Sequence, residues 1–484
     1  MKRLYLIILI VSLPCAVSAG IILDVVFPRI DSDGNPPVLP KVDSVFVFGS
    51  VNPAMIPVTV DGFPAAVFPS GAFIAYLPFD YNIGYFIIEA ALLNESVSVI
   101  LPYKIPEPTI YTSEILTDST GCLLMVIDPH AVMRYSPFAG VYYMFPDSGT
   151  TVWSHVKMGN FYGIRLNDAH EVWIEDKFAT VVPDGQLPRI ERIYKAYIEE
   201  NQSESRLIVP CRSYPAVKVE EFDNPSGIRL RLYGIESHLD RVRYSGDYIK
   251  RVDWKQEDAQ TMLIDVIVKS PRLWGYKPEI TEGGFVLHVK HPPDIPKIKG
   301  LKIAVDAGHG GGEFGAVGPT RLLEKDVNLD IAKKLADLLR KNGAEVLMIR
   351  EDDSTVDLYR RVDIAEAWGA DIFISVHNNA LPEGINPFLN HGTGVHFYHP
   401  HSADLARCIH RSLVKELKLQ DDGLYYHDLA VARASGMLSV LVEAAFIMHP
   451  QEEAMLREDD FRKKTAYAVF KGIENFFNIV KKEN

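Results

Sequence analysis

Three strongly apolar runs in the last third of the chain are each followed by a side chain that can bind a metal or move a proton. The runs and the residues that follow them are 301–305 with His309, 371–376 with His377, and 438–442 with Glu443. Runs of this length and composition are typical of buried strands. Ligands of open α/β sheets bind outside the carboxyl ends of the strands, so the three residues are expected at one edge of one sheet.

Between these runs the apolar residues recur at helical rather than strand spacing. A helix is predicted from about Asp326 to the Asn342-Gly343 cap, a second over 358–368 and ending at Gly369, and others near 403–417 and 461–480. Strands that alternate with helices indicate an α/β domain with a mostly parallel sheet flanked by helices. We assign this domain to residues 298–484.

His309, Glu324 and His377 form a set of two imidazoles and one carboxylate, the ligand type of a catalytic zinc with an open position. Glu443 is then left as a candidate general base. Taken singly, each residue has an ordinary alternative. A lone histidine is more often structural, and Glu324, expected just before a helix, could be a solvated or capping carboxylate. The hypothesis therefore rests on the four residues occurring together.

The same segments resemble the zinc-dependent N-acetylmuramoyl-L-alanine amidases of bacterial cell walls. The pieces DAGHGG, LLEKDVNLDIAKKLADLL, DIFISVHNNA and VLVEAAF occur in the order typical of that family. The resemblance implies a doubly wound α/β catalytic domain, zinc bound by His309, Glu324 and His377, and Glu443 as the catalytic acid–base. The chain departs from the usual His-Ala-Asn at His377-Asn378-Asn379, which affects the expected groove shape and removes no ligand.

The segment that follows this motif is short. Some amidases of the family carry a long insertion here that folds as a helix over the zinc. Residues 381–391 contain two prolines and a glycine and cannot form such a helix, so we expect an open zinc site. His391 in this loop could also reach the metal.

Composition and the first residues constrain the compartment and the partners. The net charge of −13 argues against a nucleic-acid-binding protein. Lys2-Arg3, a short apolar run and Val17-Ser18-Ala19 predict a signal peptide over residues 1–19, with a membrane anchor as the alternative. No other long apolar run follows, so we expect an exported mature chain with no transmembrane segment, in the periplasm or at the cell wall.

The residues before the catalytic domain alternate like strands in three successive regions. We predict an immunoglobulin-like β-sandwich over 20–107, with 20–44 as a leader arm, and a small Src-homology-3-like barrel over 108–186. Residues 187–297 resemble a β-rich amidase N-terminal targeting domain. Tyr135, Trp153 and Trp173 of the barrel are either a binding platform or core. The proline-rich linker 292–296 is expected to hold the catalytic domain at a distance.

The resemblance implies a peptidoglycan hydrolase that cuts the amide between the lactyl group of N-acetylmuramic acid and L-alanine. Zinc would polarise the carbonyl and activate water, and Glu443 would move the proton. Two alternatives stay open: a wall-binding protein with a vestigial metal site, and a zinc peptidase that cuts stem peptides.

Overall fold

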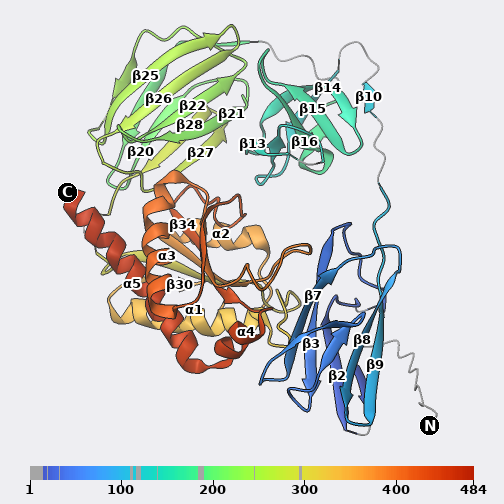
Figure 1. Ribbon diagram of the computed structural model, residues 1–484. Helices are drawn as coiled ribbons and strands as arrows, with labels where there is room; N and C mark the ends of the chain where they lie inside the picture. Colours follow the sequence, from blue (N-terminus) through green and yellow to red (C-terminus); the bar gives the residue numbers. More distant parts are fainter. Residues whose placement is uncertain are drawn as a thin grey trace.

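The computed structural model describes residues 15–18, 20–31, 33–108, 113–115, 121–138, 140–183, 190–244, 246–293 and 297–483. Three groups of strands precede one domain of strands and helices (Figure 1). Most of the expected signal peptide lies outside the described residues; its residues 15–18 form strand β1 (Cys15–Ser18), which pairs with the next strand. Among the described residues, no helix is both long and apolar enough to cross a membrane.

The N-terminal group consists of two antiparallel sheets that face each other across one core (Figure 1). The first sheet has the order β1, β2 (Ile21–Phe27), β3 (Ser44–Asn52), β7 (Ala72–Pro78), β6 (Ala66–Val67). The second has the order β5 (Phe63–Pro64), β4 (Val58–Val60), β8 (Tyr85–Leu92), β9 (Glu95–Pro102). The prediction of a leader arm over 20–44 is wrong at its start. The Pro- and Asp-rich stretch begins only after β2, whose Ile21, Leu23 and Val25 are buried in the core.

The second group is a single antiparallel sheet with a small core. Its order is β13 (Tyr142–Met144), β12 (Met133–Arg134), β16 (Glu171–Glu175), β15 (Phe161–Arg165), β14 (Thr151–Met158), β11 (Cys122–Val126), β17 (Ala179–Val181), with β10 (Ser113–Ile115) paired to β14 and the turn η1 (Asp176–Phe178) before β17. Trp153 and Trp173 are half-buried and alternate with the buried Val152 and Val172, and Tyr135 is exposed. The two tryptophans therefore lie outside the central core.

The third group again has two facing sheets and an apolar core between them. One sheet has the order β24 (Val242–Tyr244), β19 (Ala196–Glu200), β20 (Glu204–Val209), β28 (Gly284–Lys290), β27 (Tyr276–Thr281). The other has the order β21 (Val217–Phe222), β22 (Gly227–Tyr233), β26 (Thr261–Val268), β25 (Ile249–Asp258), and β18 (Glu191–Ile193) pairs with β23 (Ile235–Ser237). We call this group the third β module.

The C-terminal domain is a six-stranded sheet covered by helices (Figure 1). Its order is β30 (Glu345–Met348), β29 (Lys302–Ala307), β31 (Ile372–Asn379), β34 (Leu438–Phe446), β32 (Thr393–Phe397), β33 (Asp421–Tyr426). All strand pairs of this sheet are parallel except that of β32 with β34, which is antiparallel. The helices are α1 (Glu324–Lys341), α2 (Leu358–Trp368), α3 (Ala403–Leu417), α4 (Pro450–Arg457) and α5 (Asp459–Glu483), with the turn η2 (Pro400–Ser402) before α3.

The two faces of this sheet have separate cores. Apolar residues of α1, α3 and α5 pack on one face, and α2 with the segment that precedes β34 packs on the other. Helices α2 and α3 begin and end where the sequence predicted, whereas α4 and β33 were not predicted. Asp357 caps α2 by accepting from the amides of Tyr359 and Arg360, and Gly369 ends the helix in the left-handed conformation.

The third β module is docked on the C-terminal domain, so the expectation that the linker separates them is wrong. Trp274 of the module is part of the core that α5 covers, with its ring 6.1 Å from Phe476 and 6.3 Å from Phe477. The Tyr276 amide donates to Ser435 O at 2.7 Å, and Lys290 Nζ lies 2.8 Å from a carboxylate oxygen of Asp371. Apolar packing and polar pairs therefore hold the two units together.

Trp274→Ala is expected to destabilise the C-terminal domain, although the residue belongs to the preceding module. Removing a buried Trp side chain usually costs about 3–5 kcal/mol because a cavity remains. We expect a clear fall in the Tm at which the helical circular dichroism of this domain is lost. Tyr194→Ala, an exposed residue of the same module, is the control and should leave that Tm nearly unchanged. Equal Tm values for the two variants would contradict the packing role of Trp274.

Candidate metal and acid–base site

The site lies at the carboxyl ends of three neighbouring parallel strands, β29, β31 and β34. His377 on β31 and Glu443 on β34 are register partners, so their side chains leave the sheet on the same side. His309 follows β29, and Glu324 is the first residue of α1. Glu324 was predicted to lie just before a helix. The structure places it inside the first turn, because the helix begins two residues earlier than predicted.

His309, Glu324 and His377 converge on one point. The Nε2 atom of His309 lies 3.2 Å from Oε2 of Glu324, and Nδ1 of His377 lies 3.0 Å from its Oε1. Their side chains are 32%, 5% and 17% exposed, so the group opens to solvent on the His309 side. One ligand atom from each residue lies within 4.8 Å of the others, which makes this a candidate metal-binding group.

Glu324 is fixed by donors from three directions. Asn328 Nδ2 donates to Oε1 at 3.1 Å, the Asn378 amide donates to the same oxygen at 3.2 Å, and the Ala316 amide donates to Oε2 at 2.7 Å. Burial alone would raise the pKa of Glu324, but the adjacent imidazoles of His309 and His377 lower it well below the usual range. The residue is therefore a carboxylate at neutral pH, as a cation ligand must be.

The loop that carries His309 has a constrained backbone. His309 adopts a left-handed conformation with φ of 61°, which is uncommon for a residue with a Cβ. Its carbonyl accepts from Arg361 Nη2 at 2.8 Å, and Arg350 Nη2 donates to Gly308 O at 3.1 Å. A Cβ at Gly308 would lie 2.2 Å from the His377 ring. The two buried arginines and the glycine thus hold the imidazoles close together.

Glu443 lies beside this group; the residue is half-buried, and its Oε2 atom is buried. Within the described part of the chain its Oε2 has no hydrogen-bond partner. Burial, followed by the nearby charges of Glu324 and Asp422, raises the pKa of Glu443 well above the usual range. A buried carboxyl with a free oxygen next to a candidate metal group is the arrangement that general acid–base chemistry requires.

Several residues of the site were not singled out from the sequence. Asn328, Asn378, Arg350 and Arg361 orient the predicted residues, and Asp306 accepts from Arg361 at 2.6 Å. Of these residues, only Asp306 could have been picked out from the sequence, because it directly follows the first apolar run. The arginines come from segments whose charges look like ordinary surface charges.

The loop after β31 forms no helix over the site, as the sequence predicted. Residues 381–391, all of which the structure describes, contain no helix. His391 does not join the candidate metal group. Its Nδ1 lies 2.5 Å from Oε1 of Glu452, and its ring stacks on His449 with centroids 4.3 Å apart. This second group belongs to α4 and the loop rather than to the strand ends.

Comparison with known proteins identifies the class of the C-terminal domain. The family model for N-acetylmuramoyl-L-alanine amidase matches residues 303–475. The uncharacterized protein YqiI of Bacillus subtilis is 34% identical over 185 residues, 37% of this chain and 87% of that protein. The probable cell wall amidase LytH of Staphylococcus aureus is 34% identical over 183 residues, which cover 37% of this chain and 60% of LytH.

A solved structure is also similar in sequence. The N-acetylmuramoyl-L-alanine amidase AmiC2 of Nostoc punctiforme is 31% identical to this chain. The match covers 37% of this chain and 97% of that one, with a TM-score of 0.35. On the family model and the sequence relatives, the C-terminal domain is that of a cell-wall amide hydrolase. The chain belongs to the N-acetylmuramoyl-L-alanine amidase family, and the resemblance seen in the sequence is confirmed.

Proposed function

We propose that this protein is a zinc-dependent peptidoglycan hydrolase that cuts the amide between the lactyl group of N-acetylmuramic acid and L-alanine. His309, Glu324 and His377 would hold the zinc. The observation that carries the proposal is the convergence of two imidazoles and one buried carboxylate beside the unpartnered Oε2 of Glu443. Family membership supplies the choice of this amide.

The residues fit zinc on the chemistry of the donor set. Two imidazoles and one carboxylate are borderline and hard donors of the kind that catalytic zinc sites use, and they leave a position for substrate. Asn328 and the Asn378 amide orient Glu324 in the way that outer-shell hydrogen bonds orient metal ligands. The space that Gly308 leaves for the His377 ring would be filled by any larger side chain.

Bound zinc supplies a Lewis acid that polarises the scissile carbonyl and acidifies water. Glu443 takes the proton of the attacking water and then gives it to the leaving amine of L-alanine. Burial raises the pKa of Glu443, because the charged carboxylate is poorly solvated there. This favours the protonated form of Glu443 between the attack of water and the departure of the amine. Asn328, Arg350 and Arg361 do not touch substrate in this scheme; they hold Glu324 and the His309 loop in place.

Product analysis of digested peptidoglycan tests this function. Purified sacculi are incubated with the protein, and the soluble products are separated and identified by mass. An amidase releases whole stem peptides with a free L-alanine amine and leaves glycan with free lactyl ethers. Shortened stem peptides would point to a zinc peptidase, and bound protein without products would point to a wall-binding role; either result contradicts the proposal.

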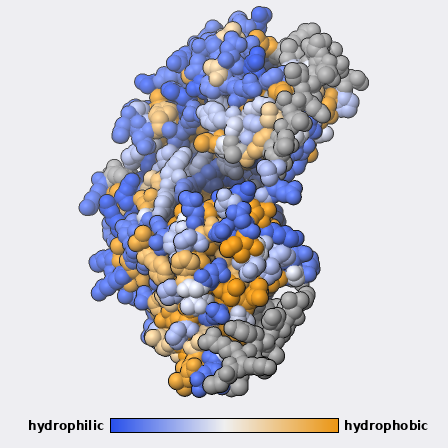
Figure 2. All heavy atoms as spheres, turned by 45° about the vertical axis from the view of Figure 1, so that its right-hand side comes forward, coloured by the Kyte–Doolittle hydropathy of each residue, from blue (hydrophilic) through white to orange (hydrophobic). Residues whose placement is uncertain are grey.

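We further propose that the enzyme acts outside the cytoplasm, with residues 1–19 as an export signal. The three β groups would be an immunoglobulin-like sandwich (20–107), a small Src-homology-3-like barrel (108–186) and an amidase N-terminal-like domain (187–297) that present the catalytic domain to the wall. Figure 2 shows hydrophobic surface over the lower half of the molecule, which in Figure 1 holds the N-terminal sandwich together with part of the amidase domain. Exposed Ile83, Tyr85 and Ile100 belong to that sandwich and support a binding face there.

A further inference from the structure

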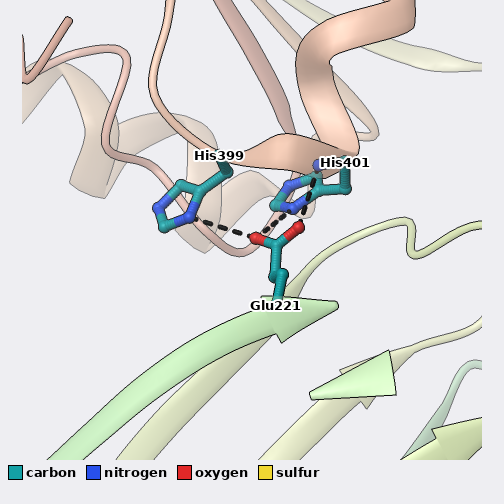
Figure 3. Close-up of side chains that lie close together, drawn as sticks. All are labelled: Glu221, His399 and His401. Atoms are coloured by element: carbon teal, nitrogen blue, oxygen red, sulfur yellow. Dashed lines mark hydrogen bonds and ion pairs between the residues drawn. The ribbon is translucent and has the colours of Figure 1, made fainter. Parts of the chain in front are cut away.

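Another group of two histidines and one glutamate, separate from that of His391, His449 and Glu452, lies at the junction between the third β module and the amidase domain. Glu221 comes from β21 of the module, and His399 and His401 come from the segment that joins β32 to α3 (Figure 3). Oε1 of Glu221 lies 3.2 Å from Nδ1 of His399 and 2.8 Å from Nδ1 of His401. The type and spacing of the residues match those of the His309, Glu324 and His377 group.

The hydrogen bonds of the two rings fix which nitrogen carries a proton. Nε2 of His399 lies 2.8 Å from the carbonyl oxygen of Arg433, and Nε2 of His401 lies 3.2 Å from that of Met437. A carbonyl oxygen only accepts, so both Nε2 atoms are protonated. In a neutral ring the Nδ1 atom then presents a lone pair, and both Nδ1 atoms face the same carboxylate oxygen. A metal-bound histidine commonly donates its other N–H to a carbonyl in this manner.

A fourth possible ligand atom, an oxygen, adjoins the group. The hydroxyl oxygen of Tyr276, on β27, lies 3.2 Å from Nδ1 of His399. The side chains of Glu221, His399 and His401 are 3%, 13% and 1% exposed, so the group is closed where the His309 group is open. Structural zinc sites are closed and four-coordinate, whereas catalytic ones keep a position for substrate.

We propose that Glu221, His399, His401 and Tyr276 form a second, structural divalent-cation site of the zinc type that clasps the third β module to the amidase domain. A cation at this point accepts the converging lone pairs of two neutral imidazoles and the charge of the buried carboxylate. Arg433 and Met437, whose carbonyls orient the rings, lie in the segment that leads into β34, the strand of Glu443. The site therefore ties the module to the segment between β32 and α3 and to the segment that leads into β34. The proposal does not depend on the chemistry of the amidase site.

Metal content of the full chain tests this site. Each protein is dialysed against metal-free buffer after loading with zinc, and zinc per chain is measured by mass spectrometry. We expect two zinc ions in the parent, one in Glu221→Gln, one in His377→Ala and none in the double variant. Glu220→Gln, the neighbouring residue on β21 that pairs with Lys218, is the matched control and should keep two. The contribution of the amidase site is read separately, from the loss caused by His377→Ala.

A second readout uses cobalt and does not require Glu221→Gln to fold. His377→Ala loaded with Co²⁺ should show visible ligand-field absorption and a Tm that falls when a chelator is added. Adding His399→Asn to this variant should abolish both signals. The alternative is a metal-free pair in which His401 carries a second proton and donates it to Glu221. A His377→Ala chain with no bound zinc and a Tm insensitive to chelator would establish that pair and overturn the proposal.

Discussion

Replacing His377 by alanine is expected to remove one zinc per chain and to abolish amidase activity. The group would keep only His309 and Glu324, and catalytic zinc sites use three protein ligands. The Lewis acid contributes several kcal/mol of transition-state stabilisation, so we expect a loss of at least about 10³-fold in kcat/KM. Zinc is counted by mass spectrometry, and activity is measured as release of stem peptide from a soluble muramyl peptide.

The same result is expected for His309→Ala, with a matched control in the same domain. His410→Ala changes a histidine of α3 that pairs with Asp421 at 2.7 Å. It should keep both the zinc content and the activity. If His377→Ala or His309→Ala retained the full zinc content of the parent, these two residues would not be ligands and the assignment of the site would be wrong.

The strand ends explain why the core of the candidate site could be predicted. His377 and Glu443 close apolar runs, and the parallel register of β31 with β34 then makes them neighbours. Glu324 was harder to place, because no capping side chain marks the start of α1: Leu323 occupies the cap position and its side chain caps nothing. The orienting partners Arg350 and Arg361 could not be predicted, since they reach the loop only after the sheet and α2 have packed.

The contacts between the third β module and the amidase domain could not be predicted for a different reason. Glu221 lies on a strand whose residues are all half-buried, and its neighbours in sequence are the charged Glu220 and the aromatic Phe222. Such a strand looks like an ordinary solvated edge. Only the position of His399 and His401 on another domain makes Glu221 a buried partner. Trp274 is similar, because its apolar surface is equally compatible with the core of its own module.

Glu443→Gln is expected to keep the zinc and to lose activity by about 10² to 10⁴-fold, the usual contribution of a general acid–base residue. Glutamine has the shape of glutamate but cannot take the proton of the attacking water. Burial, then the charges of Glu324 and Asp422, raise the pKa of Glu443. A base acts only when deprotonated, so the activity of the parent should fall as the pH drops through this raised pKa.

The activity that remains in Glu443→Gln should therefore be low and should not show the parent's fall at acidic pH. Zinc content, stem-peptide release and the profile of kcat/KM against pH are measured on Glu443→Gln, on the parent and on Glu458→Gln, an exposed control after α4. If Glu443→Gln lost its zinc, Glu443 would be a ligand rather than the base. If it kept both zinc and rate, the free Oε2 of Glu443 would play no part in proton transfer, and another group would have to supply that step.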